Sequence, residues 1–125
     1  MTEHKTIENA LDFEVLRRAI EDLDAELLTN LYAEDAEWRF VSRDAPPSSP
    51  YLLKGRQEIV DNYRKVFEAQ DITQRVQNEV ISGDRLALTV AAEYSDGRRE
   101  LCANTVELNE DGKISRHTII LVRDE

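Results

Sequence analysis

The chain of 125 residues contains a single cysteine, Cys102. A disulfide needs two cysteines and a thiol-based zinc site needs several, so the sequence predicts neither. Cys102 lies in an alternating apolar segment, which favours a buried, unreactive thiol over a nucleophile. Histidine is also scarce. Because His4 and His117 have no metal-binding spacing, we predict no metal site and no cofactor.

Basic residues are also fewer than acidic ones. The chain has 16 Lys and Arg against 26 Asp and Glu, which gives a formal net charge of −10. Such a surface repels phosphate backbones and anionic lipids, so we expect no nucleic acid and no membrane as partner. No apolar run approaches the length of a membrane span, and residues 1–5 lack the apolar core of a signal peptide. We therefore expect a cytoplasmic protein in a reducing compartment.

Proline and glycine are few, and they lie where turns are expected. All three prolines fall within residues 42–50, which predicts a long loop. Gly83, Gly97 and Gly112 each follow Ser or Asp and separate segments of alternating hydrophobicity. These segments predict four consecutive strands over residues 74–81, 86–94, 99–108 and 113–122.

The first half of the chain mostly has a helical period. Apolar residues recur every three or four positions across residues 7–23 and 55–69, which predicts two amphipathic helices. Asp24 is a suitable N-cap for a further, short helix between them. Residues 36–41 alternate and predict one early strand. With a hydrophobic fraction of 41%, the sequence predicts one α+β domain over residues 1–125.

Several short segments, taken in order, carry a resemblance to a known family. They are residues 19–24, 31–38, 54–59, 96–98 and 111–114. Together they are similar to the corresponding segments of SnoaL-like proteins, which belong to the nuclear-transport-factor-2-like superfamily. The resemblance covers about residues 8–122 and leaves residues 1–6 as an expected flexible tail.

The resemblance implies a cystatin-like cone, in which a curved, mostly antiparallel sheet wraps around three helices and encloses a pocket open at one end. Family members are commonly homodimers that pack through the outer face of the sheet. On this sequence, the face opposite Leu86, Leu88 and Val90 carries small and β-branched residues, as a subunit contact would. They are Ala87, Thr89, Ala91, Ala103, Thr105, Thr118 and Ile120. We therefore expect a homodimer.

The side chains expected to face the pocket follow from strand alternation and from the apolar stripe of helix 55–69. They are Trp38, Phe40, Tyr63, Phe67, Cys102, Asn104, His117 and Ile119. Most are apolar or aromatic, so we expect a small, largely apolar ligand. A four-residue turn at 109–112 would place Asn104 directly opposite His117, with side chains about 5 Å apart.

Asn104 and His117 form the predicted catalytic pair. Imidazole titrates near neutral pH, so His117 could act as general acid or base. Asn104 could orient that ring or donate a hydrogen bond to a substrate carbonyl. The alternative is that His117 is a polar wall residue satisfied by its neighbour. An isomerase or cyclase, a non-catalytic ligand carrier and a structural subunit or adaptor therefore remain open.

Comparison with two enzymatic branches of the superfamily restricts the chemistry. Resemblance to ketosteroid isomerases would place the catalytic base at Phe40, the tyrosine at Leu16 and the acid at Asn104. Phenylalanine cannot accept a proton and leucine cannot donate one, so that mechanism is excluded. The epoxide-hydrolase branch needs an acid in the last strand, and residues 117–121 contain none.

Overall fold

The computed structural model describes residues 11–69 and 71–124. These residues form two α-helices, one 3-10 turn and six strands. In chain order the elements are α2 (Phe13–Glu21), η1 (Ala25–Leu28), β1 (Tyr32–Val41), β2 (Tyr51–Lys54), α3 (Arg56–Glu68), β3 (Ile72–Ser82), β4 (Arg85–Tyr94), β5 (Arg99–Leu108) and β6 (Ile114–Arg123). No helix in the described ranges is long and apolar enough to cross a membrane.

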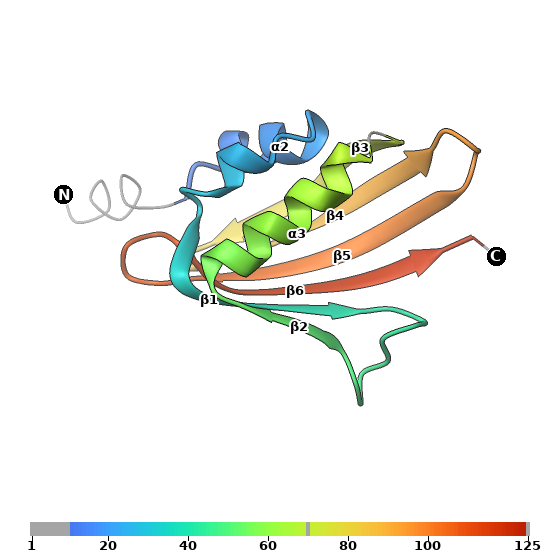
Figure 1. Cartoon of the computed structure of the whole chain (residues 1–125). Coiled ribbons are helices and arrows are strands. Elements are labelled where there is room, and N and C mark those ends of the chain that lie inside the picture. The colour runs from blue at the N-terminus through green and yellow to red at the C-terminus, as the bar shows by residue number, and fades with distance from the viewer. Residues whose placement is uncertain (1–10, 70, 125) are drawn as a thin grey trace.

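The six strands form one mixed sheet in the order β2-β1-β6-β5-β4-β3. All neighbours are antiparallel except β1 and β6, which run parallel. The helices lie on one face of the twisted sheet and leave the other face uncovered (Figure 1). The predicted α+β class is therefore confirmed, with the sheet mixed by one parallel pair.

The expectation of three helices is not confirmed. The described residues contain two α-helices, and the segment after Asp24 is a single 3-10 turn. Asp24 caps that turn by accepting from the backbone N–H groups of Glu26 and Leu27. Residues 29–31 form a turn that leads from η1 directly into β1.

The first helix is also shorter than predicted. Within the described residues it begins at Phe13, after Asp12 caps the N–H of Glu14, and residues 7–10 of the predicted helix and the predicted tail 1–6 lie outside the described part. The helix ends at Glu21, because Leu23 has a φ of 55° in the left-handed region.

The four consecutive strands β3, β4, β5 and β6 were each predicted to within two residues at both ends. A period of two in hydrophobicity identifies a half-buried strand directly. Two strand predictions were incomplete. β1 begins at Tyr32 rather than at residue 36, and β2 was not expected. Residues 42–50 are the predicted loop, and they connect β1 to β2 as a hairpin at the edge of the sheet (Figure 1).

The core lies between the helices and the concave face of the sheet. Leu16 and Ile20 from α2, and Ile59 from α3, are buried with the central strands in one cluster. Leu86, Leu88 and Val90 alternate inward from β4, as their spacing predicts. Removal of these apolar side chains from water is the main stabilising contribution to the fold.

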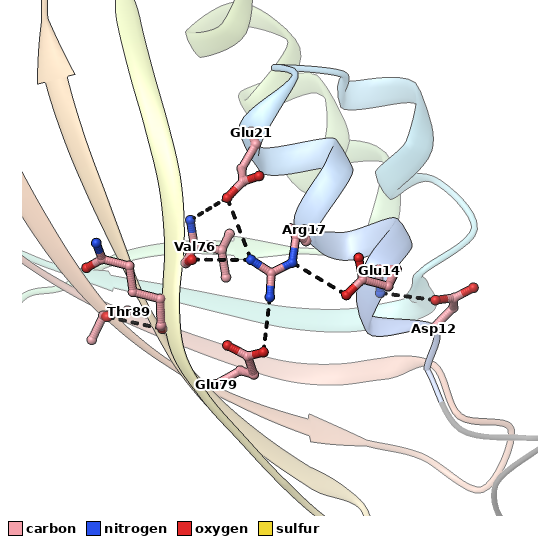
Figure 2. Close-up of polar contacts among 8 residues, drawn as sticks. Asp12, Glu14, Arg17, Glu21, Val76, Glu79 and Thr89 are labelled. Carbon is pink, nitrogen blue, oxygen red and sulfur yellow. Dashed lines mark hydrogen bonds and ion pairs between the residues drawn. The ribbon is translucent and has the colours of Figure 1, made fainter.

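Polar side chains fasten α2 to the outermost strand, β3 (Figure 2). The carboxylate of Glu21 accepts from the backbone N–H of Val76 at 2.9 Å, and Arg17 Nη1 lies 3.4 Å from the Val76 carbonyl oxygen. Arg17 also pairs with Glu79 at 3.0 Å, across the same edge. The two helix residues thus satisfy backbone groups of β3 that no further strand reaches.

Replacing Glu21 with Ala leaves the N–H of Val76 without its acceptor. We expect the free energy of unfolding to fall by about 1–2 kcal/mol, measured by urea denaturation. Glu14→Ala is the matched control on the same helix, because Glu14 contacts Arg17 from an exposed position, and it should change stability by less than about 0.5 kcal/mol. Equal effects of the two substitutions would contradict this role of Glu21.

Candidate functional site

A cavity of about 280 Å³ lies between the helices and the sheet. Every described helix and strand contributes to its wall. The lining includes all of the residues predicted from alternation and the helix stripe: Trp38, Phe40, Tyr63, Phe67, Cys102, Asn104, His117 and Ile119. The structure therefore brings the predicted site residues together around one space.

Aromatic rings form one wall of this cavity. Trp38 and Phe40 stack with their ring centroids 5.6 Å apart and planes 6° from parallel. Tyr63 meets Trp38 edge-on at 6.0 Å, and Phe67 packs against Tyr63 at 5.5 Å. These contacts between β1 and α3 make a rigid apolar surface.

Asn104 and His117 are in contact, although not in the predicted register. The sheet pairs Asn104 with Ile119 and Val106 with His117, so the two residues are diagonal neighbours. An irregularity between Glu107 and Leu108 shifts the register near the turn. The prediction of direct opposition was wrong. The contact itself forms, with Nε2 of His117 2.7 Å from Oδ1 of Asn104.

The second nitrogen of His117 is also engaged. Its Nδ1 lies 2.7 Å from the hydroxyl of Tyr32, which comes from the first residue of β1. Burial lowers the pKa of His117 to about 3, so the ring is neutral at pH 7. Burial, and then the neighbouring hydroxyl of Tyr63, raise the pKa of Tyr32 well above its ordinary value. The Tyr32 side chain therefore keeps its proton.

The backbone carbonyl of Cys102 determines which atom donates in the hydrogen bonds that join Asn104, His117 and Tyr32. Nδ2 of Asn104 lies 3.4 Å from the carbonyl oxygen of Cys102, which can only accept. Oδ1 of Asn104 must then face His117, so Nε2 of the ring donates to it. A neutral imidazole has one donor and one acceptor, and Nδ1 therefore accepts from the Tyr32 hydroxyl.

Tyr63 lies beside this group of side chains. Nε1 of Trp38 donates to the Tyr63 hydroxyl at 3.1 Å, and the Tyr63 and Tyr32 ring centroids are 6.5 Å apart. No buried side-chain nitrogen or oxygen among the described residues lacks a partner. His117 consequently has no ring nitrogen left for a ligand, whereas Asn104 retains one amide N–H beyond its bond to Cys102.

A second polar group lines the cavity at the ends of three neighbouring strands. Glu100 accepts a hydrogen bond from the Tyr94 hydroxyl at 3.0 Å and forms an ion pair with Arg123 at 3.1 Å. The Glu100 side chain is only 8% exposed, whereas that of Arg123 is 45% exposed. Partly exposed lining residues gather at this end of the sheet, so the cavity opens here.

The predicted site omitted Tyr32, Tyr94, Glu100 and Arg123. The same alternation that selects Cys102 and Asn104 also places Glu100 on the inward face, and it places Arg123 with His117. These charged residues were missed because the search favoured apolar positions. Tyr32 was missed because the predicted strand began four residues after it.

Metal ligands do not cluster in the part of the chain that the structure describes. No group of three or more His, Cys, Asp and Glu side chains there could hold a metal ion. Burial, with a further contribution from Glu100, raises the pKa of the Cys102 thiol to about 11. That side chain is therefore a protonated, weakly polar part of the wall.

Solved structures with the same architecture are numerous, and three illustrate the similarity. An NTF2-like protein of unknown function from Mesorhizobium loti superposes with a TM-score of 0.78 at 17% identity, over 95% of this chain and 92% of its own. A bacterial protein with a cystatin-like fold from Silicibacter pomeroyi DSS-3 gives 0.70 at 20% identity, over 88% and 72%. A steroid delta-isomerase from Pseudomonas aeruginosa gives 0.65 at 17% identity, over 83% and 72%. At these identities the likeness shows the fold.

Sequence comparison places the chain in a family. No curated protein matches the sequence. The family profile described as a SnoaL-like domain matches residues 14–117, which is most of the chain and includes both His117 and Asn104. The chain therefore belongs to the SnoaL-like domain family, within the NTF2-like fold.

Proposed function

We propose that the protein binds a small, largely apolar molecule that carries a carbonyl group. The observation that supports this most is the combination of an aromatic-walled cavity with a side-chain donor of fixed orientation, Asn104. A volume of about 280 Å³ is just below the usual range for ligand pockets, which begins at about 300 Å³, so the ligand is small.

The amide of Asn104 determines which kind of polar atom the ligand needs. Because one N–H of Asn104 lies towards the Cys102 carbonyl and Oδ1 accepts from His117, the second amide N–H is open to an acceptor on the ligand. A carbonyl oxygen meets that requirement. The net charge of −10 disfavours anionic ligands at the same site.

Acid–base catalysis of the isomerase or cyclase kind is the second candidate. It is supported by the hydrogen-bonded Tyr32, His117 and Asn104 beside the cavity, and by the steroid delta-isomerase among the structural neighbours. Leu16 and Phe40 line the cavity where a ketosteroid isomerase would need its tyrosine and base, so that mechanism stays excluded. For His117 to move a proton, one of its two hydrogen bonds must open when the ligand binds. The resting geometry thus favours binding over catalysis.

A homodimer through the uncovered sheet face is part of the proposal. The helices cover only the opposite face (Figure 1). On β5 and β6, Leu101, Ile120 and Val122 are 49%, 49% and 66% exposed, and the register places Leu101 beside Val122. This uncharged surface can meet a second copy of itself around a two-fold axis without bringing like charges together.

The binding proposal is tested with acetylnaphthalene and ethylnaphthalene, which have similar shapes but differ by the carbonyl oxygen. We expect the wild-type protein to bind the ketone about three- to tenfold more tightly, as one hydrogen bond predicts. Asn104→Leu should remove that preference, while Asn62→Leu, at another lining position, should keep it. Calorimetric titration gives both affinities, and circular dichroism verifies folding. Failure of both compounds to bind the wild type would refute the proposal.

Catalysis is tested by exchange of the acetyl methyl protons of acetylnaphthalene in deuterium oxide, followed by NMR. If His117 is the acid–base group, His117→Gln should slow the exchange by about 10²-fold or more. His4→Gln, which changes the remaining histidine of the sequence, should have no effect. If the exchange with wild-type protein is no faster than in buffer, catalysis is contradicted and only ligand binding remains.

The dimer is tested by native mass spectrometry. We expect twice the chain mass of 14.4 kDa for the wild type, and the monomer mass for Ile120→Asp, because two buried carboxylates would face each other. Val80→Asp is the control, since Val80 is 63% exposed on the edge strand β3. A wild-type monomer would contradict the homodimer and favour a different partner on this face.

A further inference from the structure

Glu100 lies at the open end of the cavity with both carboxylate oxygens engaged. Oε1 accepts from the Tyr94 hydroxyl at 3.0 Å, and Oε2 lies 3.1 Å from Nη2 of Arg123. The three residues come from adjacent strands, and Glu100 is directly opposite Arg123 in the register. All three line the cavity. Because Glu100 lines the cavity and is 8% exposed, its carboxylate is available to a ligand there.

Stability alone does not account for this arrangement. Removing the Glu100 carboxylate from water costs free energy that its attraction to the partly exposed Arg123 only partly recovers, and apolar residues in such positions are often as stable. Cys102 and Leu121, the next inward residues on the same two strands, show that apolar side chains are accepted on this face. A role in recognition explains why a charged pair lies here.

The chemistry of the group favours a neutral partner that both donates and accepts. The carboxylate and the guanidinium cancel each other's charge, so neither an anion nor a cation gains a net attraction. Each carboxylate oxygen has a further lone pair, and Arg123 has further N–H donors. Burial, and then Glu100, raise the pKa of Tyr94 to about 12, so its hydroxyl remains a donor. A hydroxyl group on the ligand matches this set, because it donates to Glu100 and accepts from Arg123.

The distance between the two polar ends defines the ligand's shape. Glu100 and Asn104 lie on the same face of β5, four residues apart, which separates them by roughly 13 Å along the strand. Between them lie the weakly polar thiol of Cys102 and the aromatic wall. Building on the proposed function, we infer that Glu100 and Arg123 form a second recognition site, which binds a hydroxyl group at the end of the ligand opposite its carbonyl.

Two naphthalene ketones test the inference. Both carry an acetyl group on one ring, and at the far end of the other ring one carries a hydroxyl group and the other a methoxy group, which cannot donate. We expect the wild-type protein to bind the hydroxy ketone about tenfold more tightly, as a hydrogen bond to a charged acceptor predicts. In Glu100→Gln this preference should fall below about threefold, because a neutral acceptor is weaker.

Glu107→Gln is the matched control. Glu107 lies on the same strand and also pairs with an arginine, Arg116, but it does not line the cavity. Its substitution should leave the tenfold preference unchanged. If Glu100→Gln does not fold, Glu100→Asp replaces it, since it keeps the charge but withdraws the carboxylate from the cavity, and the same loss of preference is expected.

The outcomes separate this inference from the proposed function. If acetylnaphthalene and both substituted ketones bind with equal affinity, or if Glu100→Gln keeps the preference, the second site is refuted while ligand binding stands. If none of the three ketones binds the wild-type protein, the proposed function is refuted, and the inference falls with it.

Discussion

The buried imidazole of His117 determines the polarity of the deep end of the cavity. An imidazolium there would lose its hydration, and burial accordingly lowers the pKa of the ring to about 3. A neutral ring has one donor and one acceptor, and the Cys102 carbonyl orients the amide of Asn104, so Asn104 accepts from the ring and Tyr32 donates to it. These contacts join β1, β6 and β5. The same bonds that hold three strands together therefore leave one amide N–H of Asn104 that none of them uses.

Much of this arrangement could be predicted from the sequence, because strand alternation needs no knowledge of the neighbouring strands. The side of the strand on which each residue lies was enough to predict that Trp38, Asn104 and His117 line one cavity. The register could not be predicted in this way. The irregularity beside Leu108 shifts the register of β6 against β5, and the hydrophobic pattern of the sequence does not reveal it. The brief β2 and the 3-10 turn η1 contain too few residues to show a period.

The charged end of the cavity was overlooked for a related reason. Glu100 and Arg123 occupy inward-facing positions, yet a search for a core disregards charged residues, since most of them are solvated. Their pairing depends on register and on tertiary contact, which a single sequence does not reveal. The structure shows a cavity with different chemistry at its two ends, a neutral donor at Asn104 and an ion pair at the opening. Such an asymmetric site can hold an unsymmetrical molecule in one orientation.

The contacts between α2 and β3 bear on how a molecule could enter the cavity. Leu16 and Ile20 of α2 form part of the wall, so lifting the helix is one geometric route inward. That movement would also take Arg17 and Glu21 away from Val76 and leave an unprotected strand edge, onto which another chain could add as an extra strand. Entry from that side would thus carry a risk of aggregation. Entry through the end bearing Glu100 and Arg123 avoids this risk, because it leaves the contacts of Arg17 and Glu21 with Val76 in place.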